Sequence, residues 1–323
     1  MENQLVSILI PVYNRLSLVS ETIESAINQT YKNIEIIICD NCSTDGTWEL
    51  IQQYALKDNR IIIFQNNSNI GPVNNWFKCL SFATGQYIKL LWSDDLIEKS
   101  YISKAIKLFD DDTSIVMSGI IVFSESKYKY FSRYQKLNEI SSKSYLLDML
   151  IYNRHNFPGS PGCAVLRNSH FISKIPTNLT NNFNLDFSKN GAGIDLLFFL
   201  FSALEGRKIK FINENLSYFR SHKESITVIE SSSIIIYYEL AKLYFINQFY
   251  PKYLDEFKTA LRIKLIFNKA FKNIDQQVNG KYVININLIL LFIRQLTAYT
   301  IQKMKYIIKI LINENSISST RSR

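Results

Sequence analysis

The sequence predicts an α/β fold, in which a mostly parallel, Rossmann-like sheet carries helices on both faces and a C-terminal helical appendage follows. Two patterns lead to this prediction. Through about residue 91, short runs that are mostly apolar alternate with segments whose apolar residues recur at helical spacing. Strands that are apolar throughout are buried on both faces, as in parallel sheets covered by helices. Beyond about residue 230 the pattern changes to long helical segments with apolar and basic faces.

The expected elements follow one another in a regular order. The apolar runs predict strands at 6–10, 34–39, 60–65 and 86–91, with helices between them at 17–29, 46–57 and 72–83. Later in the chain we expect a strand at 113–123, a Gly/Pro turn with a short strand at 159–167, a helix from near Asp195 to Gly206, and short strands at 208–212 and 215–220.

Polar residues follow the first, second and fourth predicted strands at their carboxyl ends. They are Pro11, Tyr13 and Asn14, then Asp40 and Asn41, then Asp94 and Asp95. Because ligands of open α/β sheets bind beyond the carboxyl ends of the strands, the three clusters are expected to meet at one rim. Each cluster alone fits a solvated turn. Together they predict a ligand site.

The excess positive charge lies in the C-terminal part of the chain. Residues 1–230 hold 23 Lys and Arg against 23 Asp and Glu, whereas residues 231–323 hold 14 against 5, which accounts for the whole formal charge of +9. This argues against a body that binds nucleic acid and for a basic C-terminal attachment. The longest uncharged run there, 282–293, is shorter than the roughly 20 residues of a membrane span. An interfacial helix on anionic lipid, a tilted span and a packing or dimerising appendage stay open as alternatives.

Other classes of site find little support. Four cysteines in 323 residues suit a reducing cytoplasm better than a disulfide scaffold, and the single CxxC, Cys39 and Cys42, lacks a second pair for a four-ligand zinc site. No GxGxxG and no GK[ST] motif occurs, so neither a dinucleotide-binding loop nor a P-loop is expected. No signal peptide is expected, because the apolar start at 5–13 has no basic leader.

Three segments resemble, in order and spacing, the N-terminal half of the family-two glycosyltransferases. They are SILIPVYNR (7–15), IIICDNCSTDGTWELI (36–51) and NIGPVNNWFKCLSFATGQYIKLLWSDD (69–95), and the resemblance extends to about residue 225. Those enzymes have the GT-A fold, use nucleotide-sugar donors, most often with UDP, and invert the anomeric centre. The resemblance implies a GT-A domain at 1–228, followed by a basic amphipathic helical tail at 229–323.

The resemblance also gives the strand-end residues roles in donor binding. Asp40 would accept the N3–H of a uracil ring, and Pro11 and Tyr13 would pack against that base. A nucleotide sugar brings a diphosphate, on which Mg²⁺ or Mn²⁺ is held by one or two carboxylates plus phosphate oxygens. Asp95 would bind this metal, and Asp94 the ribose or the metal. The first acid of the family's D-x-D-D pattern is missing here, so the division of roles between them stays open.

Inversion by a single displacement needs a carboxylate that takes the proton from the attacking acceptor hydroxyl. The segment that begins GIDLLFF resembles the family helix that carries this base, which makes Asp195 the candidate, although Gly193 replaces an acidic residue of the family pattern. The alternative for Asp195 is an acid that only favours the helix dipole. His222 falls near the expected diphosphate or metal, and Arg220 and Lys223 could screen the phosphates from a mobile loop.

The sequence therefore predicts a metal-dependent cytoplasmic glycosyltransferase, peripherally associated with the inner face of the cell membrane. Its partners would be a nucleotide-sugar donor and a lipid-linked or oligosaccharide acceptor of surface polysaccharide synthesis. The basic tail would contact the inner membrane surface or another copy in a homo-oligomer, and no nucleic acid is expected to bind. A non-catalytic nucleotide-binding scaffold and a nucleotidyltransferase-like enzyme are the alternatives.

Overall fold

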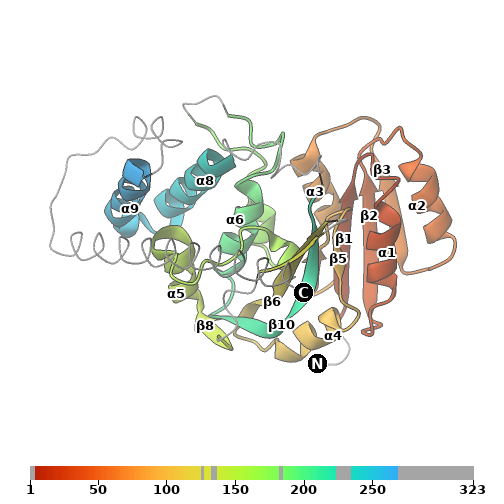
Figure 1. Cartoon of the computed structure of the whole chain (residues 1–323), viewed down its shortest axis with the longest axis horizontal. Helices are drawn as coiled ribbons and strands as arrows, with labels where there is room; N and C mark the ends of the chain where they lie inside the picture. The colour runs from red at the N-terminus through yellow and green to blue at the C-terminus, as the bar shows by residue number, and fades with distance from the viewer. Residues whose placement is uncertain (1–3, 125–126, 132–136, 182–184, 223–233, 268–323) are drawn as a thin grey trace, which may run out of the picture.

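A computed structural model describes residues 4–124, 127–131, 137–181, 185–222 and 234–267 (Figure 1). Within these residues, ten strands form one sheet in the order β3-β2-β1-β4-β9-β6-β10-β5, with β7 paired to β6 and β8 to β10. The strands are β1 Val6–Val12, β2 Ile34–Asp40, β3 Ile61–Gln65, β4 Tyr87–Leu90, β5 Leu96–Ile97, β6 Thr113–Ser124, β7 Lys127–Phe131, β8 Glu139–Ser141, β9 Ala164–Arg167 and β10 Lys208–Arg220.

The described helices alternate with the strands in the first half of the chain and lie close together in the second half. The α-helices are α1 Val19–Ile27, α2 Thr47–Ala55, α3 Pro72–Ser81, α4 Tyr101–Leu108, α5 Ser142–Leu147, α6 Ile194–Ser202, α8 Ile234–Phe249 and α9 Leu254–Phe267. Short turns of other helix types are η1 Asp148–Tyr152, η2 Pro161–Cys163, η3 Ile172–Lys174 and η4 Pro251–Tyr253.

The first half of the sheet is parallel, as its apolar runs predict. β1 pairs in parallel with β2 and β4, and β2 pairs in parallel with β3. β9 then runs antiparallel between β4 and β6, and β10 lies parallel to β6, so the sheet is mixed beyond β4. The carboxyl ends of β1, β2 and β4 consequently meet at one rim, which is where the polar clusters were expected.

Two details of the second half differ from the prediction. The strands expected at 208–212 and 215–220 are one strand, β10, whose pairing with β6 shifts register on both sides of Asn215. The helix expected to end at Gly206 ends at Ser202, because backbone hydrogen bonds from Leu204 to Phe201 and from Glu205 to Ser202 tighten the chain into a narrower turn.

Helices cover both faces of the sheet, and successive side chains of one strand enter two different cores. On one face, Ile8 and Ile10 of β1 belong to a buried cluster with residues of α1 and α4. On the other face, Leu9 belongs to a cluster with residues of α3, α6 and α8. Figure 1 shows α1 and α2 beside β1, β2 and β3 at one end of the molecule, with α6, α8 and α9 toward the other.

The predicted tail begins inside this second core rather than after it. Phe245 and Ile246 of α8 are completely buried, and the Phe245 ring meets that of Phe201 in α6 edge-to-face, with centroids 5.6 Å apart. The predicted domain boundary at 228 therefore does not separate two cores. The remainder of the tail, residues 268–323, lies outside the described residues, as do most of the membrane and oligomer predictions that rest on it.

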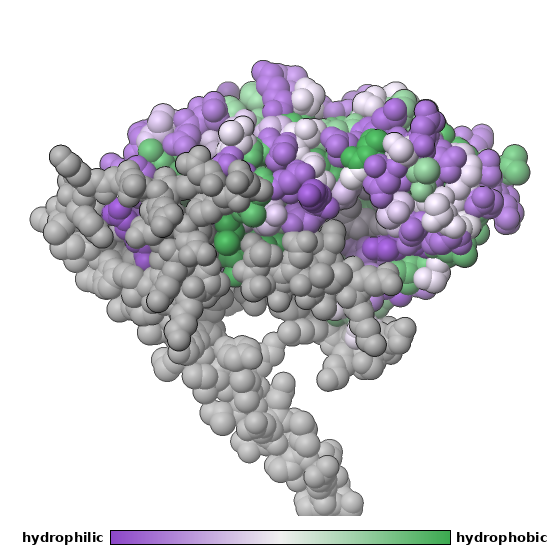
Figure 2. Space-filling view, turned by 90° about the horizontal axis from the view of Figure 1, so that it is seen from above, coloured by the Kyte–Doolittle hydropathy of each residue, from purple (hydrophilic) through white to green (hydrophobic). Residues whose placement is uncertain are grey.

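The described surface gives no sign of a bilayer-crossing element. Among the described helices, none has both the length and the apolar character needed to cross a membrane. Where Figure 2 shows coloured atoms, the surface seen from above is largely hydrophilic, with apolar residues in small groups.

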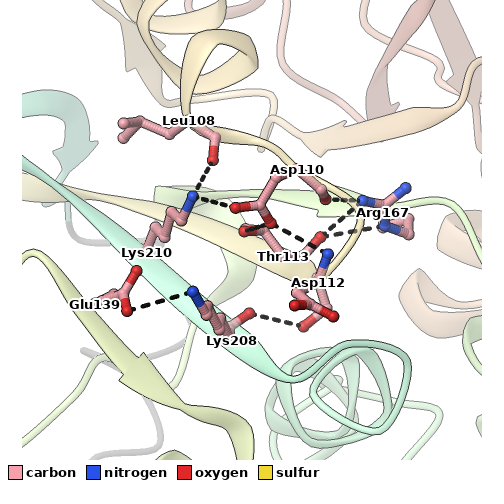
Figure 3. Close-up of polar contacts among 9 residues, drawn as sticks. Leu108, Asp110, Asp112, Thr113, Glu139, Arg167, Lys208 and Lys210 are labelled. Atoms are coloured by element: carbon pink, nitrogen blue, oxygen red, sulfur yellow. Dashed lines mark hydrogen bonds and ion pairs between the residues drawn. The ribbon is translucent and has the colours of Figure 1, made fainter.

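A polar cluster joins β6, β9 and β10 at the end of the sheet where β6 and β10 begin (Figure 3). Lys210 Nζ donates to the Leu108 carbonyl at 3.0 Å and to Asp110 Oδ2 at 2.6 Å. Arg167 donates to the carbonyl oxygens of Asp110 and Thr113. Hydrogen bonds from Lys210 and then Thr113 hold the pKa of Asp110 well below its usual range.

We expect Asp110→Asn to lower the stability of the protein at pH 7 and to make that stability less sensitive to acid. A carboxylate whose pKa is depressed by folding stabilises the fold above its unfolded pKa of about 3.9, and this contribution is lost as the pH falls toward the folded pKa. Urea unfolding should therefore show a gap between wild type and variant that is similar at pH 7 and pH 5 and narrower at pH 3. Asp112→Asn is the control, because its ion pair with Arg207 is solvent-exposed at 3.6 Å. An equal gap at all three pH values would contradict this role of Asp110.

Candidate active site

A pocket of about 730 Å³ opens at the rim where the three polar clusters were expected. Its walls come from the carboxyl ends of β1, β4 and β10, from the residues around the start of α3, and from α6 and α8. The residues that line it are Pro11, Val12, Tyr13, Asn14, Arg15, Asn41, Asn69, Pro72, Asn75, Trp76, Trp92, Ser93, Asp94, Asp95, Ser160, Asn190, Gly191, Ala192, Asp195, Phe219, Arg220, Ile234 and Tyr238.

The acidic pair lies in a tight turn between β4 and β5. The Asp95 N–H donates to the Trp92 carbonyl at 3.0 Å, which closes the turn. Two groups of Arg220, at the end of β10, hold it in place: the backbone N–H donates to Asp95 Oδ1 at 2.8 Å, and Nε donates to the Asp94 carbonyl at 3.0 Å. Arg220 also donates to Glu21 on α1 at 2.8 Å. In this structure, Arg220 therefore orients the acidic turn.

The two carboxylates differ in their surroundings. Asp94 is about one-fifth exposed, and its Oδ2 lies 2.8 Å from Nε2 of an equally exposed His222. Asp95 is only 6% exposed, and its burial, followed by the charge of Asp94, raises its pKa well above the usual range. Two adjacent acids and an imidazole at a pocket wall offer oxygen and nitrogen ligands suited to Mg²⁺ or Mn²⁺. No group of three or more such side chains placed to hold a metal occurs among the described residues, so phosphate oxygens would have to complete the coordination.

A buried lysine lies behind the acidic turn, and the sequence reasoning missed it. Lys89, on β4, is completely buried, donates from Nζ to the Gly162 carbonyl, and sits over the Tyr101 ring at 4.8 Å. Burial lowers its pKa to about 7, while the nearby Cys163 and Asp95 act in the opposite direction. A lysine inside an apolar strand, in QYIKLL, was the available sequence signal.

Asp195 lies in the first turn of α6 and faces the pocket, where the sequence reasoning expected the base. Its Oδ1 accepts hydrogen bonds from the N–H groups of Gly193 at 2.9 Å and Leu196 at 2.8 Å, and its Oδ2 accepts from the Tyr238 hydroxyl at 2.6 Å. The residue is 9% exposed, and burial raises the pKa of its carboxyl to about 7. A carboxylate with a pKa near neutrality suits a general base.

Asp40 does not join these residues. It has no exposed surface and does not line the pocket; its carboxylate accepts from the N–H and hydroxyl of Ser43 and from Gln65 Nε2 at 3.1 Å. Its neighbour Asn41 reaches the pocket instead and donates to Asn69 at 2.8 Å. In this structure Asp40 anchors the turn after β2, and its contact with the donor base stays a prediction.

The remaining predicted site residues divide into two groups. Pro11 and Tyr13 line the pocket, and Tyr13 is 42% exposed. His222 is not a lining residue, but it contacts Asp94, which is. Lys223 lies outside the described residues.

Two tryptophan rings form an aromatic wall in the pocket that the acidic turn and Asp195 also line. The rings of Trp76 and Trp92 lie 4.7 Å apart, and Trp92 Nε1 donates to Ser160 Oγ at 2.9 Å. Gly191 has a φ of +75° and packs against the Trp76 ring. A Cβ atom on residue 191 would lie 1.9 Å from that ring. Only glycine fits this position, and the wall that it supports is an apolar surface suited to the face of a sugar ring.

The protein has the GT-A fold. Among solved structures, the S. aureus TarS fragment in complex with UDP-GlcNAc matches with a TM-score of 0.56 at 17% identity, over 80% of this chain and 79% of that one. The mannosyltransferase PcManGT from Pyrobaculum calidifontis, in complex with GDP-Man and Mn²⁺, matches with a TM-score of 0.52 at 14% identity, over 85% and 79%. At these identities the matches show the fold alone.

The family follows from the sequence match. Residues 7–173, about half of the chain, match glycosyl transferase family 2, so the chain belongs to that family. This confirms the resemblance drawn from the three motifs.

Curated relatives agree with the family assignment. The Escherichia coli UDP-Glc:alpha-D-GlcNAc-diphosphoundecaprenol beta-1,3-glucosyltransferase WfaP is 42% identical over 125 residues, which is 39% of this chain and 46% of WfaP. The Streptococcus pneumoniae glycosyltransferase GlyG is 25% identical over 230 residues, 69% of this chain and 73% of GlyG. The chain thus matches less than half the length of WfaP.

Proposed function

We propose that the protein transfers one sugar, with inversion, from a nucleotide-sugar donor to a hydroxyl of a lipid-linked glycan during surface polysaccharide synthesis. The observation that carries this proposal is the opening of the acidic turn and of Asp195 into one pocket. UDP is the expected nucleotide, since WfaP is named for a UDP-sugar donor and a diphosphoundecaprenol acceptor, and TarS was solved with UDP-GlcNAc.

Asp94 and Asp95, with His222 beside them, are the residues that would hold Mg²⁺ or Mn²⁺. Such an ion would stabilise the negative charge that develops on the departing nucleotide. The complex of PcManGT with Mn²⁺ supports this assignment. Arg220 contributes by fixing the turn, through its bonds to both acids.

The chain's own residues would then organise the two substrates. Pro11 and Tyr13 would pack against the nucleoside. Asn41 would supply the polar contact to the base that had been expected from Asp40. Asp195 would accept the proton of the acceptor hydroxyl as that oxygen attacks C1 of the donor sugar. The bond from C1 to the diphosphate breaks as the new glycosidic bond forms on the opposite face, which inverts the anomeric centre.

A transfer assay tests this function directly. The full chain is incubated with Mn²⁺, a GlcNAc-diphosphate-lipid acceptor and, in turn, UDP-Glc, UDP-GlcNAc, UDP-Gal and GDP-Man, and products are detected by mass spectrometry. One donor should extend the acceptor by one sugar, and NMR of the product should show the anomeric configuration opposite to that of the donor. Retention of configuration would contradict the single displacement.

We further propose that residues 268–323 hold the enzyme at the inner membrane surface. This segment carries 9 Lys and Arg against 2 Asp and Glu. Each cation near anionic lipid contributes roughly 1 kcal/mol to binding.

Removal of residues 268–323 is therefore expected to reduce co-sedimentation with anionic vesicles several-fold at low salt. The chain should be shortened after residue 267, because α8 contributes residues to the core and its Tyr238 lines the pocket. Uncharged vesicles are the control. Equal binding of the full and shortened chains to anionic vesicles would contradict the membrane role, and a change of mass in analytical ultracentrifugation would favour the oligomer alternative.

A further inference from the structure

We infer that Tyr238, on α8, is a positioning residue for the base: its hydroxyl orients Asp195 so that one carboxylate position is left for the acceptor hydroxyl. The inference rests on the proposed role of Asp195 as the base. Tyr238 belongs to the segment that the sequence assigned to a separate tail, and nothing in the family motifs at 7–95 points to it.

Counting hydrogen bonds identifies the free position. A carboxylate offers about four lone-pair sites, two on each oxygen. Oδ1 of Asp195 accepts two N–H groups, from Gly193 and Leu196, and Oδ2 accepts the Tyr238 hydroxyl. Among the described contacts, the fourth site, on Oδ2, is the one that stays available. Since Asp195 and Tyr238 both line the pocket, an acceptor hydroxyl can reach that site from the pocket.

Two glycines allow Tyr238 to come this close. A Cβ atom on Gly193, where φ is +83°, would lie 2.7 Å from the carbonyl oxygen of Tyr237. A Cβ atom on Gly159 would lie 3.1 Å from the Tyr238 ring. Any side chain at Gly193 would push α8 away from α6, so the replacement of the acidic residue of the family pattern by glycine makes room for the tyrosine.

The hydrogen bond from Tyr238 to Asp195 also affects the pKa of Asp195. Burial is the largest influence on the pKa of Asp195 and raises it, and the Tyr238 hydroxyl is the first of the groups that lower it. Burial, and then the Asp195 charge, raise the pKa of Tyr238 well above its usual range, so Tyr238 remains a donor. The other charged groups on elements packed against α6 are Glu239 and Lys242 of α8, paired at 3.4 Å, Lys174 of η3, Lys78 of α3 and Lys143 of α5. Asp94, Asp95 and Arg220 face the same pocket.

The test is the pH dependence of transfer by Tyr238→Phe. Losing a hydrogen bond to a charged group should lower kcat about 10- to 100-fold at pH 7 with the donor KM unchanged. Without this donor the pKa of Asp195 rises, and because the base acts when ionised, the acid limb of the kcat profile should move to higher pH by about one unit. Tyr244→Phe, the same change on α8 outside the pocket, should leave both the rate and the profile unchanged.

A second variant covers the case in which Tyr238→Phe fails to fold. A ring-fluorinated tyrosine at position 238 keeps the shape and makes the phenol a stronger donor, so the acid limb should move to lower pH. A wild-type rate and profile in a folded Tyr238→Phe, or no shift with the fluorinated residue, would overturn the inference.

Asp195→Asn separates the two claims. If this variant still transfers sugar, the proposed base is wrong and the inference falls with it. If it is inactive while the Tyr238 variants behave as wild type, the inference alone is wrong.

Discussion

Asp195→Asn is expected to lower kcat for sugar transfer by about 10²- to 10⁴-fold, the usual contribution of a positioned general base. The amide keeps the shape of the side chain, and its oxygen can still accept from Gly193 and Leu196, so the start of α6 should be preserved. Donor affinity should not change, because Asp195 acts on the acceptor hydroxyl. In the wild type, kcat should fall as the pH drops below about 7, since burial holds the pKa of Asp195 there and the protonated acid is no base.

The control for this substitution is Asp186→Asn. Asp186 precedes α6 in the chain but does not line the pocket, and its carboxylate accepts from Ser188. We expect it to retain transfer. Substantial transfer by Asp195→Asn, measured with saturating donor and acceptor, would remove Asp195 from the mechanism and bring the non-catalytic scaffold back into consideration.

Substitution of the acidic pair should have the second largest effect. Asp94→Asn and Asp95→Asn are each expected to lower kcat/KM by at least about 100-fold at fixed Mn²⁺, because the proposed metal ion would lose a ligand. Asp94 is more exposed than Asp95, so added Mn²⁺ should partly restore Asp94→Asn. It should not restore Asp195→Asn, which separates loss of metal from loss of the base. Full activity of the wild type in EDTA would contradict the metal assignment.

Periodicity and strand order were enough to predict the first half of the fold. The mostly apolar runs at 6–10 and 34–39 are typical of strands buried on both faces, and parallel strands bring their carboxyl ends together. That reasoning placed the acidic turn and the residues after β1 at one pocket, where the structure has them. Family resemblance, rather than periodicity, supplied Asp195.

The pattern could not determine which of two adjacent side chains faces a ligand. Asp40 and Asn41 both follow β2, but only Asn41 lines the pocket, because Ser43 and Gln65 already bind the Asp40 carboxylate. Which of the two side chains faces the pocket depends on the local geometry of the turn between residues 40 and 43. A shift of one residue would exchange their directions.

The role of α8 was also beyond the sequence pattern. IIIYYELAKLYFINQF is apolar around much of its circumference, which fits either a separate helix or a helix buried in a larger core. Contacts between residues far apart in the chain decide the matter, such as those of Gly159 and Gly193 with residues 237 and 238. A glycine that faces a distant helix has no local signature.

Calorimetric titration of nucleoside diphosphates into the full chain tests the central claim, a metal-dependent donor site in this pocket, most directly. UDP, GDP and dTDP are each titrated in Mn²⁺ and in EDTA, with Asp94→Asn in parallel. We expect one nucleotide, UDP, to bind in Mn²⁺, to bind far more weakly in EDTA, and to lose that difference in Asp94→Asn. Absence of binding by all three nucleotides under both conditions would contradict the donor site at the acidic turn.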